Sequence, residues 1–144
     1  MDGAATRQLI RDWWSAFGEK NLERFVSYLA EDASIENNYG MRLDSRAEFA
    51  EYVRPLFAMS TDAEVTVERT IVEDDHAAAE LHMVATHDGA PVYGVEASGK
   101  RLDHTWTIHV ELVDAKVKRI RIFSNPLTIL EQLGVSDGIP LVRP

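Results

Sequence analysis

The chain has 144 residues, of which 45% are hydrophobic, and these values predict one globular domain over residues 1–144. It has no cysteine and a net charge of −9, which excludes disulfides and thiolate metal sites and disfavours nucleic acid or an anionic membrane as a partner. No apolar run approaches the ~20 residues of a membrane span, and the N-terminus lacks the basic start and apolar core of a signal peptide. We therefore expect a cytoplasmic protein.

The N-terminal part of the chain predicts two helices. Apolar side chains recur at spacings of three and four over residues 6–17, which is the pattern of an amphipathic helix. Thr6 can cap this helix, and Gly18 can end it because glycine tolerates the left-handed turn. Asn21 can cap a second helix that runs to about residue 30.

A short strand is predicted next, over residues 32–40, and a third helix follows it. Ser45 can cap this helix, whose apolar residues again show helical spacing. Pro55 lies near its end and is expected to bend or shorten it, because proline lacks the backbone N–H that a helix uses.

After Thr61 the hydrophobic period changes to two, which indicates strands. We expect strands at 63–72, 76–87, 102–112 and 117–124, and then a short helix that Asn125-Pro126-Leu127 opens and Gly134 ends. Helices followed by long strands predict an α+β domain, in which a curved antiparallel sheet wraps around three N-terminal helices as a cone-shaped α+β barrel. The open end of such a cone is a natural ligand cavity.

Three local patterns resemble the nuclear transport factor 2-like superfamily, which includes ketosteroid isomerase and the SnoaL-like polyketide cyclases. They are Asn21-Leu22-Glu23 leading to Tyr28-Leu29-Ala30-Glu31-Asp32-Ala33, His87-Asp88-Gly89 followed by Gly94 and Ser98-Gly99-Lys100-Arg101, and Asp114-Ala115-Lys116-Val117 running to Asn125-Pro126-Leu127 and Gln132-Leu133-Gly134. The third also resembles the phenazine-biosynthesis A/B-type proteins. The resemblance implies a single SnoaL-like domain, a homodimer and a role in the biosynthesis of natural products such as antibiotics.

The acidic residues that these relatives use are absent from the matching positions. By resemblance, Asn37 stands where ketosteroid isomerases have their aspartate base, and Trp13 stands where they have their oxyanion-hole tyrosine. Ile122 stands where the phenazine A/B-type proteins have a pocket glutamate. Isomerisation by a carboxylate base is therefore disfavoured.

His104 is the leading candidate for a catalytic residue. Strand alternation places it on the same side as Leu102 and Trp106, so that its imidazole faces the core or the cavity. There it could act as an acid or base near neutral pH, or donate a hydrogen bond to a substrate carbonyl. The alternative is a core histidine bonded to a backbone carbonyl. Asn37 is the second candidate, because its amide can orient a carbonyl or hydroxyl, although Asn-Asn-Tyr-Gly is also good turn chemistry.

The candidate substrate-binding residues come from the first helix, the strands and the loops near the expected cavity mouth. They are Trp13, Tyr39, Met83, His87, Tyr93, Trp106 and Ile122. For Trp13 and Met83, a plain core role is favoured over a role in the pocket. The five histidines do not cluster with carboxylates in a metal-ligand pattern, so we expect neither a metal nor another cofactor.

We interpret the chain as a small cofactor-independent cyclase or isomerase acting on a hydrophobic, polyketide-like small-molecule substrate. Ring closure would be promoted by the shape of the pocket and by hydrogen bonds. The alternative is a non-catalytic carrier of small molecules, or a dimeric interaction subunit of the same fold. Epoxide opening or dehydration would need an acid–base pair, and Asp103 and His104 face opposite sides of a regular strand.

Overall fold

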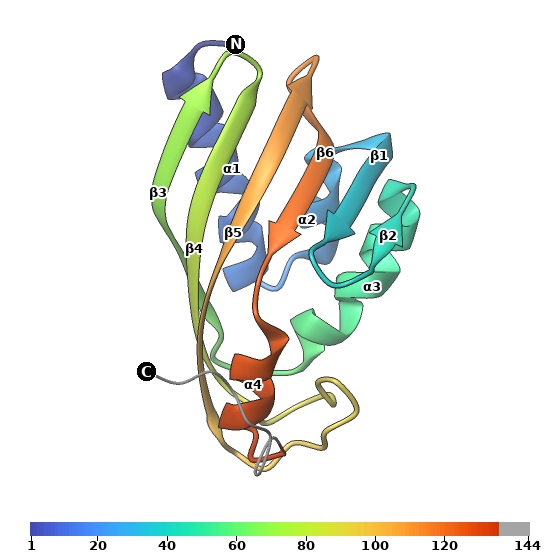
Figure 1. Ribbon diagram of the computed structural model, residues 1–144, viewed down its shortest axis with the longest axis vertical. Coiled ribbons are helices and arrows are strands. Elements are labelled where there is room, and N and C mark those ends of the chain that lie inside the picture. Colours follow the sequence, from blue (N-terminus) through green and yellow to red (C-terminus); the bar gives the residue numbers. More distant parts are fainter. Residues whose placement is uncertain (136–144) are drawn as a thin grey trace.

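The computed structural model describes residues 1–135, in which three helices precede most of a six-stranded sheet (Figure 1). The predicted domain, residues 1–144, extends beyond this described part. The elements in chain order are α1 (Gly3–Gly18), α2 (Leu22–Ser27), β1 (Leu29–Asn37), β2 (Arg42–Leu43), α3 (Arg46–Ala58), β3 (Glu64–Glu73), β4 (His76–Thr86), β5 (Arg101–Val113), β6 (Lys116–Phe123) and α4 (Pro126–Gln132).

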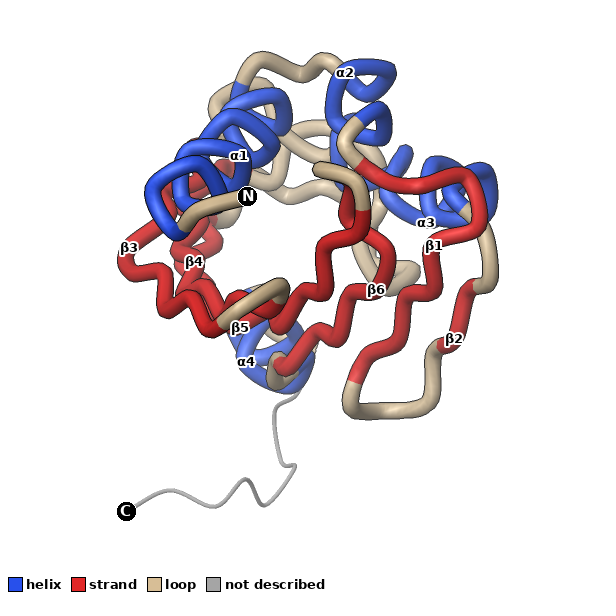
Figure 2. Tube along the Cα trace, turned by 90° about the horizontal axis from the view of Figure 1, so that it is seen from above, coloured by secondary structure: helices blue, strands red, loops and turns tan. Residues whose placement is uncertain are grey.

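The sheet has the strand order β2-β1-β6-β5-β4-β3 and bends strongly, so the α+β cone that the sequence predicts is confirmed. The helices α1, α2 and α3 lie across its concave side, with α1 packed on β3 and α3 on β1 (Figure 2). Within residues 1–135, the sheet does not close into a full barrel.

One pairing differs from the predicted antiparallel arrangement, since β1 and β6 run parallel. No hairpin joins these two strands, so their direction is set by the long connection between them.

The ends of the first two helices are fixed by side-chain caps. Asp2, and not the predicted Thr6, caps α1, where its carboxylate accepts a hydrogen bond from the backbone N–H of Ala5 at 2.7 Å. Thr6 is buried inside the helix. Asn21 caps α2 as predicted, through the N–H of Arg24. The helix α2 ends earlier than expected, at Ser27, and β1 begins directly after it.

The later elements follow the prediction closely. Ser45 caps α3 and Asn125 caps α4, each through a side-chain oxygen that accepts a backbone N–H. Pro55 neither ends nor shortens α3, which continues to Ala58. Strand β2 was not predicted, because two residues are too few to show a hydrophobic period. No helix within residues 1–135 is long and apolar enough to span a membrane.

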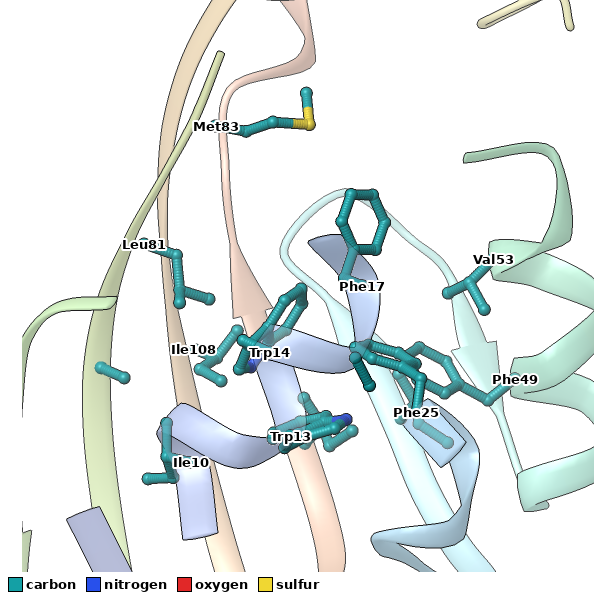
Figure 3. Close-up of a cluster of buried hydrophobic side chains, with 14 of the residues drawn as sticks. Ile10, Trp13, Trp14, Phe17, Phe25, Phe49, Val53, Leu81, Met83 and Ile108 are labelled. Atoms are coloured by element: carbon teal, nitrogen blue, oxygen red, sulfur yellow. The ribbon is translucent and has the colours of Figure 1, made fainter. Parts of the chain in front are cut away.

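Aromatic side chains pack between the helices and the sheet, and Phe25 lies among them (Figure 3). The ring of Phe25 contacts those of five other aromatic residues, with centroid distances of 5.1–6.2 Å: Trp13, Trp14, Phe17, Phe49 and Phe57. Phe25 is almost completely buried. It therefore holds α1, α2 and α3 together on the concave side of the sheet.

Asp62 ties the connection between α3 and β3 to the end of β4. Its carboxylate accepts hydrogen bonds from the Thr86 N–H at 2.7 Å and the Thr86 hydroxyl at 2.8 Å, and also from Ser60 and Arg101. These bonds, led by the one from the Thr86 N–H, lower the pKa of Asp62 to about 2. They favour the ionised carboxylate in the folded state.

The Asp62→Asn variant should therefore be less stable than the parent protein only where Asp62 is ionised. Because the pKa is lowered on folding, the stabilisation is complete above the ordinary value of 3.8 and is lost as the pH falls through about 2. We expect the difference in Tm between the two proteins to be constant near neutral pH and to shrink between about pH 4 and about pH 2. Thermal unfolding followed by circular dichroism measures this. A difference that does not change with pH, or the same loss in the exposed control Glu64→Gln, would contradict it.

Candidate functional site

A cavity of about 140 Å³ lies between the concave face of the sheet and the helices. Its wall is formed by aromatic and aliphatic side chains from α1, α2, α3, β4, β5, β6 and α4. In Figure 3, Met83 lies on the side of the sheet and Val53 on the side of α3, with Phe17 between them. The polar residues among the described lining are Tyr39, Tyr52, Tyr93, His104 and Ser124. None of these described lining residues is an aspartate, glutamate, lysine or arginine.

Six of the residues predicted from the sequence come together at this cavity. They are Tyr39, Met83, Tyr93, His104, Trp106 and Ile122. Met83 and His104 face the same side of the sheet because they are directly paired between β4 and β5. Their common position follows from strand alternation on two neighbouring strands.

The His104 side chain is half-buried, and its ring stacks on Trp106 with a centroid distance of 5.6 Å and an angle of 13° between the planes. Burial lowers the pKa of His104, so that the imidazole is neutral at physiological pH. Its Nδ1 atom is enclosed and has no hydrogen-bond partner among residues 1–135. The alternative of a core histidine bonded to a backbone carbonyl is therefore not what the structure shows.

These surroundings favour one tautomer of the neutral ring. A buried N–H without a partner is rarer and costlier than a buried acceptor without one. The enclosed Nδ1 of His104 is thus better left unprotonated, which places the proton on Nε2, the accessible nitrogen. In this form His104 offers the cavity a hydrogen-bond donor and not a base.

A side chain from α4 supports the backbone beside His104. The last pair between β5 and β6 joins Thr107 to Phe123, so β5 lacks a strand neighbour on that side at Asp103. The amide of Gln132 takes the place of that neighbour, because its oxygen accepts from the Asp103 N–H at 2.9 Å and its nitrogen donates to the Asp103 carbonyl at 2.7 Å. Sequence reasoning did not assign Gln132 a role at the site.

The Asp103 side chain points away from the cavity, as strand alternation predicts. Its carboxylate lies 2.6 Å from His82 Nε2 on the outer face of the sheet. The pKa of His82 is raised chiefly by this hydrogen bond, and further by Glu68. Asp103 and His104 therefore do not form an acid–base pair.

Three tyrosines gather at one side of the cavity. The hydroxyl oxygens of Tyr39 and Tyr93 are 3.2 Å apart, and the Tyr52 phenol interacts with that of Tyr39. Burial, followed by the interaction with Tyr39, raises the pKa of Tyr52 to about 12. The same two causes raise the pKa of Tyr93. The sequence pattern indicated only a packing role for Tyr52, because its helical spacing matches that of the neighbouring apolar residues.

Three predicted site residues lie outside the cavity lining. Asn37 accepts hydrogen bonds from the N–H groups of Tyr39 and Met41, so its side chain oxygen organises the turn after β1. Trp13 is completely buried in the aromatic core. His87 is also completely buried, and its Nε2 lies 2.8 Å from the carbonyl oxygen of Ala90. This geometry supports a role in turn formation for Asn37 and a role in core packing for Trp13, which are the alternatives that the sequence also allowed.

The outside of the sheet carries one group of potential metal ligands among the described residues. Ligand atoms of Asp75, His76 and Glu111 lie within 4.8 Å of one another. His76 and Glu111 are direct partners on β4 and β5, a proximity that the sequence spacing did not reveal. None of the three lines the cavity.

Comparison with known proteins gives one family and a common fold. The model of the SnoaL-like domain matches residues 10–120. AclR from Streptomyces galilaeus, provisionally named a hydroxylase, superposes with a TM-score of 0.85 at 21% identity, over 97% of this chain and 87% of that one. TsrD from Streptomyces laurentii superposes with a TM-score of 0.82 at 21% identity, over 94% of this chain and 98% of that one. A search of curated protein sequences gave no significant match.

An LEH-like epoxide hydrolase from M. tuberculosis also has this fold. Its TM-score is 0.69 at 14% identity, over 90% of each chain. At such identities the structural likeness establishes the architecture alone, because one fold supports many chemistries.

Proposed function

Because the chain belongs to the SnoaL-like domain family, we propose that it is a small enzyme that closes a ring in, or isomerises, an uncharged polyketide-like intermediate. The proposed catalyst needs no cofactor. The observation that carries the proposal is an apolar cavity with no ionised side chain in its described lining, into which β5 presents the neutral imidazole of His104.

The proposed mechanism has two parts. The aromatic wall folds a flexible substrate so that its reacting carbons approach one another, and such organisation can supply ~7–11 kcal/mol in the most favourable intramolecular reactions. In ring closure, the enol form of one 1,3-dicarbonyl unit of the substrate forms a carbon–carbon bond to a second carbonyl of the same molecule, whose π electrons move to its oxygen, and the enol proton passes to that oxygen through solvent. His104 donates a hydrogen bond from Nε2 to this carbonyl oxygen as it gains negative charge in the transition state. A donor in a site shielded from water stabilises such a charge more strongly than water does.

The cavity gives less support to two other reactions, epoxide opening and isomerisation by a carboxylate base. Epoxide opening by an acid–base pair needs a carboxylate beside the substrate, and Asp103 faces the outside of the sheet. Isomerisation by a carboxylate base meets the same objection, because no aspartate or glutamate is among the described lining residues. What remains is a reaction driven by shape and by neutral hydrogen-bond donors.

The test is incubation of the purified protein with a set of linear polyketone thioester mimics of increasing length. We expect at least one of them to give a cyclised or isomerised product, detected by mass spectrometry and NMR, in an amount that exceeds the amount of protein. Saturable binding that returns every ligand unchanged would contradict the enzymatic proposal. That result would instead support the second candidate function, a carrier of the same class of molecules, which the lack of a carboxylate among the described lining residues also favours.

A further inference from the structure

We propose that Tyr39, Tyr52 and Tyr93 form a subsite at the mouth of the cavity that binds the oxygen atom of an uncharged aromatic ketone. These three residues together are the tyrosine subsite. This inference rests on the proposed function, since the same ligand would occupy the cavity, and it adds the class of molecule that the site selects.

The tyrosine subsite is assembled from three segments that are far apart in the sequence. Tyr39 belongs to the turn after β1, Tyr52 to α3, and Tyr93 to the loop between β4 and β5. All three line the cavity, and Tyr39 and Tyr93 are also strongly exposed. They therefore lie where the cavity meets solvent, at the boundary that a ligand must cross.

The backbone of the β4–β5 loop is strained in a way that places Tyr93 there. Val92 and Val95 exchange backbone hydrogen bonds of 3.1 and 2.8 Å, so Tyr93 and Gly94 are the two central residues of a tight turn. Their φ angles are 49° and 74°. Turns with two positive φ values normally have asparagine, aspartate or glycine in the first position. A tyrosine is costly there, and such strain concentrates at functional positions.

The hydroxyl groups of the tyrosine subsite leave a donor for a ligand. Each phenol carries one O–H, and the hydrogen bond between Tyr39 and Tyr93 uses only one of the two hydroxyl protons of that pair. The raised pKa values of Tyr52 and Tyr93 keep these phenols protonated across the physiological range. The remaining O–H can therefore donate to a carbonyl oxygen, and it is strengthened by the bonds behind it.

The rest of the cavity selects against charge. A carboxylate ligand would bring a negative charge into a site without a lysine or arginine among its described lining residues, and an unpaired buried charge is costly. Trp14, Trp106 and Phe49 offer flat aromatic surfaces to a planar ligand. The cavity volume of about 140 Å³ is close to that of an apolar cavity that binds benzene, so one ring fits inside with its substituent toward the mouth.

The experiment compares three probes that share one ring: acetophenone, ethylbenzene and benzoate. Acetophenone carries a ¹³C label in its carbonyl group, and binding is measured by NMR titration of the full-length protein. We expect acetophenone to bind more tightly than ethylbenzene and benzoate to bind most weakly. We also expect the bound carbonyl resonance to move downfield, which is the signature of an accepted hydrogen bond.

Three variants locate the hydrogen bond. Tyr39→Phe and Tyr93→Phe should each weaken acetophenone binding by about 3- to 10-fold, the worth of one neutral hydrogen bond, and should reduce the downfield shift. Ethylbenzene binding should stay within about twofold, because the rings remain. Tyr28→Phe is the matched control, since its phenol contacts Arg24 and lies outside the cavity lining.

Several results would overturn the tyrosine subsite. These are equal affinity for acetophenone and ethylbenzene, tightest binding of benzoate, no binding of any probe, or an equal loss for both neutral probes in the two variants. The proposed function is judged separately, by product formation from the polyketone mimics. A ketone preference without any product would leave the subsite standing and remove the enzyme, whereas product without a ketone preference would do the reverse.

Discussion

Replacing His104 by alanine is expected to lower kcat by about 10²–10³-fold for whichever polyketone mimic the protein converts best, which is the usual cost of removing one donor to a developing oxyanion. The reason is that no charged group among the described lining residues of the cavity could replace the imidazole. Steady-state kinetics on purified variants measures the effect. KM should change less than kcat, because the hydrogen bond strengthens in the transition state.

Two further variants separate this role from packing. His104→Gln keeps an amide donor on the same strand and should recover part of the rate. His109→Ala removes an imidazole from the opposite face of β5, where the one described aromatic ring that it contacts is that of His76, and should leave kcat unchanged. An unchanged kcat in His104→Ala would remove His104 from the mechanism while leaving a reaction driven by cavity shape.

The pH dependence of the proposed activity in the parent protein is a second check on the state of His104. Burial lowers the pKa of this residue from its ordinary value of 6.5, so the ring is neutral at every pH above that value. A neutral donor then gives a rate that is flat from pH 6.5 upward until other groups titrate. A rate that rises through pH 7 as a histidine deprotonates would indicate a base with an ordinary or raised pKa, contrary to the donor role.

Phe25→Ala is expected to have the largest effect on stability, a loss of about 3–5 kcal/mol in the free energy of unfolding. Phe25 is almost completely buried and packs on aromatic rings from α1 and α3, so its removal leaves a hole between three helices. Because the ring also lines the cavity, that hole is continuous with the cavity. Urea denaturation followed by tryptophan fluorescence measures the loss.

Two control variants test whether the loss of stability depends on the volume removed and on the burial of the ring. Phe25→Leu should cost clearly less than Phe25→Ala, because most of the volume is kept. Phe123→Ala removes a ring that is 39% exposed, and its cost should be small. A loss below about 1 kcal/mol in Phe25→Ala would show that the aromatic cluster is not packed as described.

Much of the fold follows from local rules, which explains why the sequence predicts it. The change of hydrophobic period near Thr61 marks the passage from helices to strands, and strand alternation places His104 and Trp106 on the side where the cavity lies. The caps Asn21, Ser45 and Asn125 were found because a cap is a short-range bond to the next turn. These features depend on residues within a few positions of one another.

The features that the sequence did not reveal depend on contacts between distant segments. Tyr52 has the same helical spacing as a core residue, and only the fold brings it to Tyr39 and Tyr93. Asn37 matches a catalytic position in relatives by resemblance, but its side chain oxygen is engaged by the turn that follows. The parallel pairing of β1 with β6 was missed for a similar reason, since no local turn records it.

The side-chain amide of Gln132 hydrogen-bonds to the backbone of Asp103 at a position where β5 has no neighbouring strand. The hydrogen bonds at this position can therefore break in a different way from those between two strands. A neighbouring strand can leave only if several consecutive hydrogen bonds break together, whereas a glutamine can leave by rotation about its own single bonds. Proton exchange at the Asp103 amide should then be governed by a side-chain rotamer and proceed faster than at the strand-paired amides further along β5. The backbone that carries His104, the next residue, could then move locally without any change in the hydrogen bonds of the rest of the sheet.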